Sequence, residues 1–109
     1  MKSSNYLLEC CVDSAYSARM AKKGGADRLE LCSNLVIGGT TPTLALYEQI
    51  RTQTDIRIHV LIRPRFGDFL YSEDEAALIC KEIDAFRAAG ADGVVIEVFL
   101  RTVPCVPNR

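Results

Sequence analysis

Several features that identify common classes of protein are scarce or absent in this sequence. The 109 residues contain one histidine, so a Ser-His-Asp triad would have to use His59, which lies far from any exposed serine turn. The net charge of −1 offers no basic surface for nucleic acid or an anionic membrane. No apolar run approaches the ~20 residues of a membrane span, and no secretory signal precedes the first strand. We therefore expect a cytoplasmic protein with neither a nucleic-acid nor a membrane partner.

Cysteine is present, but not in the pattern of a disulfide scaffold. The count is odd and the spacing is irregular, and the five positions are Cys10, Cys11, Cys32, Cys80 and Cys105. Without a secretory signal, a reducing compartment and free thiols are expected. The length allows one domain, and a hydrophobic content of 49% is enough for a core.

Short apolar runs alternate with longer helical patterns along the chain. Strands are expected over 6–12, 27–32, 56–62 and 93–98. Helices are expected between them, over about 15–23, 42–53 and 73–89. Thr41-Pro42 has the threonine cap and first-turn proline of a helix start, and Ser72 with Glu75 forms a capping box.

A repeated corner supports a sheet built from strand–helix units. Gly25-Ala26-Asp27 and Gly90-Ala91-Asp92 each follow a helix and lead into a strand. Four parallel strands and three helices can form half of a (β/α)8 TIM barrel or a small open sheet of the flavodoxin type. We favour the partial barrel, because a barrel interior can bury polar groups that pair with one another.

The polar groups that favour the barrel alternate along three strands. Glu9 and Glu30 have the parity of one face, and His59 with Arg63 share the parity of one face of the third strand. His59 lies deep in its strand, where a packed, hydrogen-bonded role is more common than acid–base catalysis.

Two strands end in the same pattern, Glu-x-Cys. Residues i and i+2 share a face, so Glu9 lies with Cys11 and Glu30 with Cys32. If the strands pair in register, the two thiols converge at the carboxyl edge of the sheet, where they would suit Cu(I). Alternatively, each cysteine is a small buried hydrophobe, and nearby carboxylates would raise the pKa of a thiol there.

The loop after the third strand holds a second candidate site. Arg63 and Arg65 flank a proline, and Asp68 follows in a glycine turn. Arginine pairs bind carboxylate or phosphate through two parallel hydrogen bonds. The alternative is that Arg63 neutralises Glu9 or Glu30 inside the barrel while Asp68 orders the loop.

Four blocks of this sequence resemble, in order and spacing, the CutC copper homeostasis family. They are Glu9–Ser14 (ECCVDS), Gly24–Cys32 (GGADRLELC), Gly38–Pro42 (GGTTP) and Ile62–Ser72 (IRPRFGDFLYS). The resemblance runs from about Leu7 to Ile96 and implies a cytoplasmic TIM barrel that forms oligomers and binds Cu(I). The copper-binding cysteines of the family match Cys11 and Cys32. The resemblance supplies no reaction, because the family's biochemical activity is not settled.

The chain departs from the family in its length and its last residues. A complete barrel needs ~250 residues, and the pattern breaks after Ile96, before a tail with two prolines. We expect residues 1–96 to form the first half of a barrel and 97–109 to be foreign to it, as in a truncated or frame-shifted product. Open sheet edges would then favour a homodimer, an oligomer or a partly molten state.

Together, these features predict a copper homeostasis protein fragment that holds Cu(I) through Cys11 and Cys32. One rival is an enzyme acting on a small anionic molecule, with Arg63 and Arg65 as anchors and Glu9 or Glu30 as acid–base. The other is an inactive truncated product.

Overall fold

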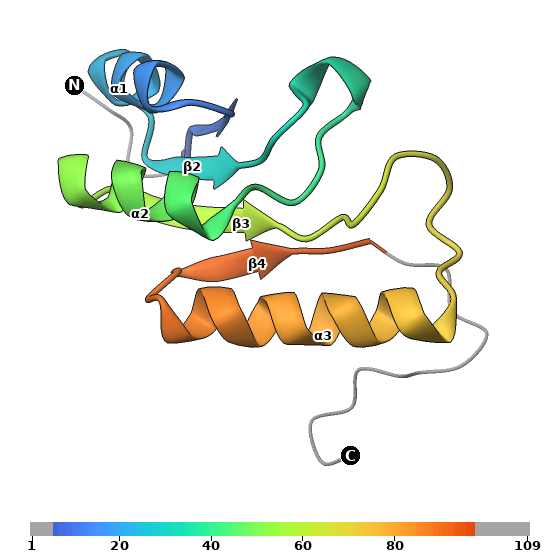
Figure 1. Cartoon of the computed structure of the whole chain (residues 1–109). Helices are drawn as coiled ribbons and strands as arrows, with labels where there is room; N and C mark the ends of the chain where they lie inside the picture. The colour runs from blue at the N-terminus through green and yellow to red at the C-terminus, as the bar shows by residue number, and fades with distance from the viewer. Residues whose placement is uncertain (1–5, 98–109) are drawn as a thin grey trace.

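A four-stranded parallel sheet is the frame of the molecule (Figure 1). The computed structural model describes residues 6–97. The strands are β1 (Glu9–Val12), β2 (Arg28–Leu31), β3 (Arg57–Leu61) and β4 (Gly93–Val95), and they lie side by side in sequence order. Each is shorter than the apolar run that predicted it. The expectation that 97–109 are foreign to the fold falls, from residue 98 onward, outside the described residues.

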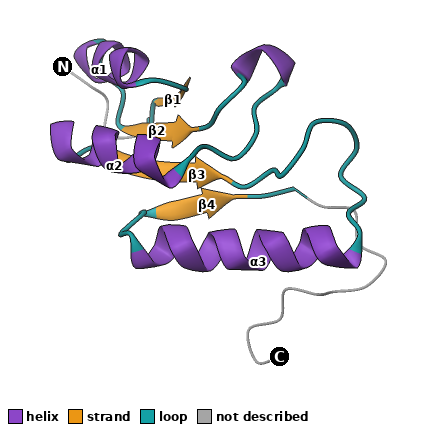
Figure 2. Cartoon of the chain, viewed as in Figure 1, coloured by secondary structure: helices purple, strands orange, loops and turns teal. Residues whose placement is uncertain are grey.

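A helix follows each of the first three strands. They are α1 (Ala15–Lys23), α2 (Leu44–Gln53) and α3 (Glu73–Ala88), with a short 3-10 helix, η1 (Leu35–Ile37), in the loop after β2 (Figure 2). A doubly wound sheet reverses its strand order and carries helices on both faces. Here the order does not reverse, so the partial TIM barrel is confirmed over the flavodoxin alternative.

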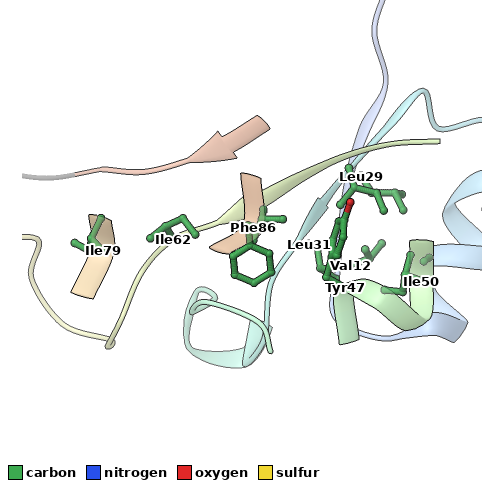
Figure 3. Close-up of a cluster of buried hydrophobic side chains, with 11 residues drawn as sticks. Val12, Leu29, Leu31, Tyr47, Ile50, Ile62, Ile79 and Phe86 are labelled. Carbon is green, nitrogen blue, oxygen red and sulfur yellow. The ribbon is translucent and has the colours of Figure 1, made fainter. Parts of the chain in front are cut away.

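The core lies between the helices and one face of the sheet. Alternate strand residues supply that face, and α1, α2 and α3 close over it. The rings of Tyr47 and Phe86 meet edge to face, with centroids 6.0 Å apart. Figure 3 shows the cluster, whose members on the strands or just past their ends are Val12, Leu29, Leu31, Ile58, Val60 and Ile62 and whose helix members are Ala18, Tyr47, Ile50, Ile79 and Phe86.

The repeated corner makes the same hydrogen bonds twice. In Gly25-Ala26-Asp27 the carboxylate accepts the backbone N–H of Leu8 at 2.8 Å, and in Gly90-Ala91-Asp92 it accepts that of Ile58 at 2.9 Å. The glycines have φ of 100° and 97°, a left-handed conformation that a side chain would strain. Each aspartate thereby ties the start of its own strand to the start of the strand before it.

The capping box at α3 is confirmed. The N–H of Glu75 donates to Ser72 Oγ at 3.1 Å, and the N–H of Ser72 donates to Glu75 Oε1 at 2.9 Å. The box satisfies two backbone donors that the helix itself leaves open.

The predicted start of α2 at Thr41-Pro42 is wrong by two residues. Thr43 is the cap instead, and its Oγ1 accepts the N–H of Leu46 at 3.0 Å. Thr41 pairs with the end of β3, donating its N–H to the carbonyl of Arg63 and accepting the Arg63 N–H on its Oγ1. These bonds keep Thr41 outside the helix, and they join residues too distant in sequence for a local pattern to reveal.

One carboxyl in the helical layer is poorly satisfied. Glu82 of α3 is half-buried, and its Oε1 is shielded from water without a hydrogen-bond partner in the described part of the chain. Burial raises the pKa of Glu82, and a hydrogen bond with Thr41 only partly opposes that rise.

The raised pKa predicts how Glu82 affects stability with pH. The folded state binds a proton more tightly than the unfolded state, so the contribution of Glu82 is greatest below its ordinary pKa and is lost as pH rises through the raised value. Glu82→Gln, which cannot ionise, should raise the melting temperature at pH 7 by a few degrees and make little difference near pH 4. Thermal melts followed by circular dichroism across this range test it, with the exposed Asp84→Asn on the same helix as control. A rise in melting temperature that is the same at every pH would contradict this explanation.

Candidate functional site

The face of the sheet opposite the helices carries polar side chains. Glu9, Glu30 and His59 alternate with the core residues of their strands, and none of the three is fully buried. The strand register aligns Cys11 with Glu30, Glu30 with His59, and His59 with Gly93. A thiol, a carboxylate and an imidazole therefore stand in one row across the open face.

Gly93 makes room for the end of that row. A β-carbon at position 93 would lie 2.9 Å from His59 Nε2, closer than real β-carbons approach other atoms. The glycine therefore lets the imidazole lie across β4. His59 is packed, as expected, but its place in the row with Cys11 and Glu30 could not be read from the sequence, because the register was unknown.

The two Glu-x-Cys patterns are staggered rather than aligned. Glu9 stands opposite Arg28, and Cys11 stands opposite Glu30. Arg28 Nε donates to Glu9 Oε2 at 2.6 Å, so Glu9 is neutralised by Arg28 and not by Arg63. Cys32 lies one residue beyond the end of β2, on the side of Glu30, and the register places it two residues further along than the position opposite Cys11.

Cys32 is covered by a loop rather than by the helices. Its side chain is 1% exposed, yet it does not belong to the helix-facing core cluster. Gly39 closes over it, since a β-carbon there would lie 3.5 Å from Cys32 Sγ. Cys32 Sγ donates to the carbonyl of Val12 at 3.6 Å. Burial, followed by the charges of Cys11 and Glu30, raises the pKa of the Cys32 thiol to about 11.

Cys11 is the exposed member of the pair. Its side chain opens to solvent, while its neighbour Cys10 packs against the core. Desolvation, followed by the charges of Glu30 and Glu9, raises the pKa of the Cys11 thiol. Because Cys11 also raises the pKa of Cys32, the two thiols share one electrostatic neighbourhood. Both are protonated in the free protein at neutral pH.

Glu30 lies beside both thiols. Desolvation and the charge of Glu9 raise its pKa, while Arg28 and a hydrogen bond with Cys11 act in the opposite direction. Glu30 also borders a pocket of about 190 Å³ at the carboxyl ends of β2, β3 and β4, where barrels carry their sites. The other lining residues are Gly38, Leu61, Ile62, Arg63, Phe69, Val95 and Glu97.

Arg63 ties two loops together. Its Nη1 donates to the carbonyl of Gly39 at 3.0 Å and its Nη2 to that of Gly67 at 3.0 Å. The guanidinium carbon lies 5.0 Å from the ring centre of Phe69. These contacts fix the loop after β2 against the loop after β3.

Arg65 is occupied within its own loop and the start of α3. Nε and Nη2 both donate to the carboxylate of Glu75, and Nη2 also reaches Asp68 Oδ1 at 3.3 Å and the carbonyl of Leu70 at 3.0 Å. Nη1 donates to the carbonyl of Asp68 at 2.8 Å. Asp68 orders the loop further, because its Oδ1 accepts the N–H of Leu70 at 3.1 Å. An anion at Arg65 would have to displace Glu75.

Residues 6–97 contain neither a cluster of metal-ligand side chains nor a helix that could span a membrane. No group of three or more His, Cys, Asp or Glu side chains there could together hold a metal ion. None of the helices in this range has the length and apolar character needed to cross a membrane.

Comparisons with known proteins agree on one family. The sequence profile of the CutC family matches residues 6–102, past the boundary expected at 96. A human protein named copper homeostasis protein cutC homolog is 46% identical over 93 residues, and a CutC family protein of Bacteroides fragilis is 49% identical over 94. The crystal structure of a putative copper homeostasis protein CutC from Streptococcus agalactiae superposes with a TM-score of 0.76 at 28% identity.

The matches cover most of this chain but only part of each relative. The matches cover 85% and 84% of this chain but 34% and 37% of the human and Bacteroides proteins, so the chain spans about a third of their length. For the Streptococcus structure the shares are 88% of this chain and 48% of the other. The profile covers most of the chain, and the fold agrees with it. This chain therefore belongs to the CutC family.

Proposed function

We propose that this chain binds Cu(I) as cargo through Cys11 and Cys32, and that this binding serves copper homeostasis in the cytoplasm. The observation that carries the proposal is the thiol pair at the carboxyl edge of β1 and β2: Cys11 is exposed, Cys32 is buried, and the two lie near enough for Cys11 to raise the pKa of Cys32. The names of the human and Streptococcus relatives support the same general role. Cys10, Cys11 and Cys32 are free thiols, as Cu(I) ligands must be, whereas Cys80 is disulfide-bonded, so the expectation that the cysteines are free is wrong for Cys80.

The donor set favours a soft monovalent ion. Thiolates bind soft ions such as Cu(I) and also bind Zn²⁺, but a structural zinc site almost always has four ligands. Residues 6–97 offer no cluster of three or more such ligands, which argues against zinc. Glu30 stands beside the thiols, but a carboxylate is a hard ligand and suits Cu(I) poorly.

The geometry implies an order of binding. Cys11 meets solvent and would take the ion first, while Cys32 lies under the loop that Gly39 closes. Each thiol must lose its proton to become a ligand, so binding one Cu(I) releases up to two protons to solvent. The raised pKa values of both thiols make that release costly in the free protein and favour tighter binding as pH rises.

The alternative of an enzyme is weakened because the two arginines expected to anchor its anionic substrate already have partners in the protein. Arg63 donates to loop carbonyls, and Arg65 is paired with Glu75. Glu30 remains beside the pocket with a raised pKa, as an acid–base group would. Binding of inorganic phosphate that Arg65→Gln abolishes would favour this alternative.

Cu(I) titration against a chromophoric Cu(I) chelator, without oxygen, tests the proposal. The wild-type chain should take up one Cu(I), and Cys11→Ser or Cys32→Ser should each weaken binding beyond the roughly 10- to 100-fold that loss of a ligand's outer partner costs. Cys10→Ser is the matched control, because Cys10 is adjacent in sequence but faces the core. An unchanged affinity in the Cys11→Ser, Cys32→Ser double variant, or no uptake by the wild type, would refute it.

Glu30→Gln tests the electrostatics of the site. Removing the negative charge should lower the pKa of Cys11, so more thiolate forms at pH 8 and iodoacetamide alkylates Cys11 faster, by up to about tenfold for each pKa unit lost. Tandem mass spectrometry separates Cys11 from Cys10, and the exposed Glu48→Gln of α2 is the control. Equal rates in the Glu30→Gln and Glu48→Gln variants would show that Glu30 does not govern the thiol.

A further inference from the structure

The tip of the loop after β2, residues 34–39, covers Cys32 without being packed into the core. The Cys32 side chain is 1% exposed, and a β-carbon on Gly39 would lie 3.5 Å from its Sγ. The apolar residues 35–37 are all exposed, and Val36 is 99% exposed. Apolar burial therefore contributes little to keeping the loop tip over the thiol, and hydrogen bonds must hold it there.

The two ends of the loop tip are fixed by the backbone. Ser33 and Thr40 form an antiparallel bridge, in which the N–H of each donates to the carbonyl of the other, at 2.9 and 2.7 Å. Next to this bridge, Gly38 and Gly39 both have a φ of 93°. Glycine rotates more freely than other residues, so this pair can absorb the backbone change of a hinge while the bridge stays closed.

Arg63 makes the only hydrogen bonds that reach the loop tip from elsewhere in the described part of the chain. Its Nη1 donates to the carbonyl of Gly39 at 3.0 Å and to that of Ile37 at 3.4 Å. The arginine is itself held by the loop after β3, through the carbonyl of Gly67 and the ring of Phe69. Charged donors make stronger hydrogen bonds than neutral ones, so these contacts keep the loop tip closed.

We propose that the loop tip is a lid, that Arg63 is its latch, and that opening the lid controls access to Cys32. Arg63 is a positioning residue in this scheme, because its hydrogen bonds are to the lid and not to the thiol. Cys11 is already exposed, so only the second thiol depends on the latch. Control of Cu(I) entry rests on the proposed function, whereas closure of the lid over Cys32 does not.

Alkylation of the full chain with N-ethylmaleimide, followed by tandem mass spectrometry, tests the latch without copper. Arg63→Gln should speed alkylation of Cys32 by at least ~10-fold, equivalent to ~1.4 kcal/mol in the opening of the lid. The rate at Cys11, which is already exposed, should not change. Loss of a positive charge alone would favour the neutral thiol and slow the reaction, so the expected increase reports opening of the lid.

Two controls separate opening of the lid from general loosening of the fold. Cys10 packs against the core of the same molecule, and its rate should stay unchanged. Arg57→Gln removes the same charge from an exposed position at the other end of β3, and it should leave Cys32 as slow as in the wild type. Arg63→Lys keeps the charge but loses the planar fork that reaches two loops, so it should give a smaller increase. This variant decides the question if Arg63→Gln exposes Cys10 as well.

Three results would overturn the latch. The first is a Cys32 that reacts no faster in Arg63→Gln than in the wild type. The second is a Cys32 rate that rises only in proportion to that of Cys10 in both Arg63 variants. The third is an equal increase in Arg57→Gln.

The copper part of the proposal has its own readout. If the wild type binds Cu(I), Arg63→Gln should also speed transfer of the ion to the chromophoric chelator, and an unchanged transfer rate would refute control of copper entry. A chain that takes up no Cu(I), but in which Arg63→Gln exposes Cys32, would refute the proposed function and support the lid.

Discussion

An aspartate at the start of one strand accepts a hydrogen bond from the strand before it, and this contact fixes the register of the β1–β2 and β3–β4 pairs. Asp27 bonds to Leu8, and Asp92 bonds to Ile58. Once those points are fixed, the pleat decides which side chains meet across the open face, because neighbouring parallel strands advance together. The placing of Cys11 beside Glu30 follows from the first of these bonds. The chemistry at the carboxyl edge thus depends on contacts at the opposite end of the strands.

Much of the fold is predictable from local patterns. Alternating apolar runs, the two Gly-Ala-Asp corners and the Ser72 capping box are short-range signals, and the structure contains all of them. The start of α2 was misplaced because Thr41 bonds to Arg63, 22 residues away. That the strands lie side by side in sequence order, with helices on one face, could be inferred only from the polar strand residues, because buried charge is better tolerated inside a barrel than in a doubly wound sheet.

The site is less predictable, because it depends on register and on long-range pairing. Parity correctly placed Glu9 and Glu30 on one face, but it could not show the stagger that pairs Glu9 with Arg28. The loop arginines looked like anion ligands from their spacing. Their actual partners are the carbonyls of Gly39 and Gly67 for Arg63, and Glu75 of the next helix for Arg65. A sequence shows which polar groups are present, but it does not show which of several possible partners each group binds.

The close fit of the His59 imidazole over Gly93 couples two positions that are 34 residues apart. Any side chain at 93 would meet the ring, so the ring must tilt away or be replaced by a smaller group. The side chains at 59 and 93 therefore share one limited space, so a larger residue at one position should be compensated by a smaller residue at the other. Gly93→Ala alone would strain the sheet edge, whereas the same change with a small residue at 59 would restore the fit.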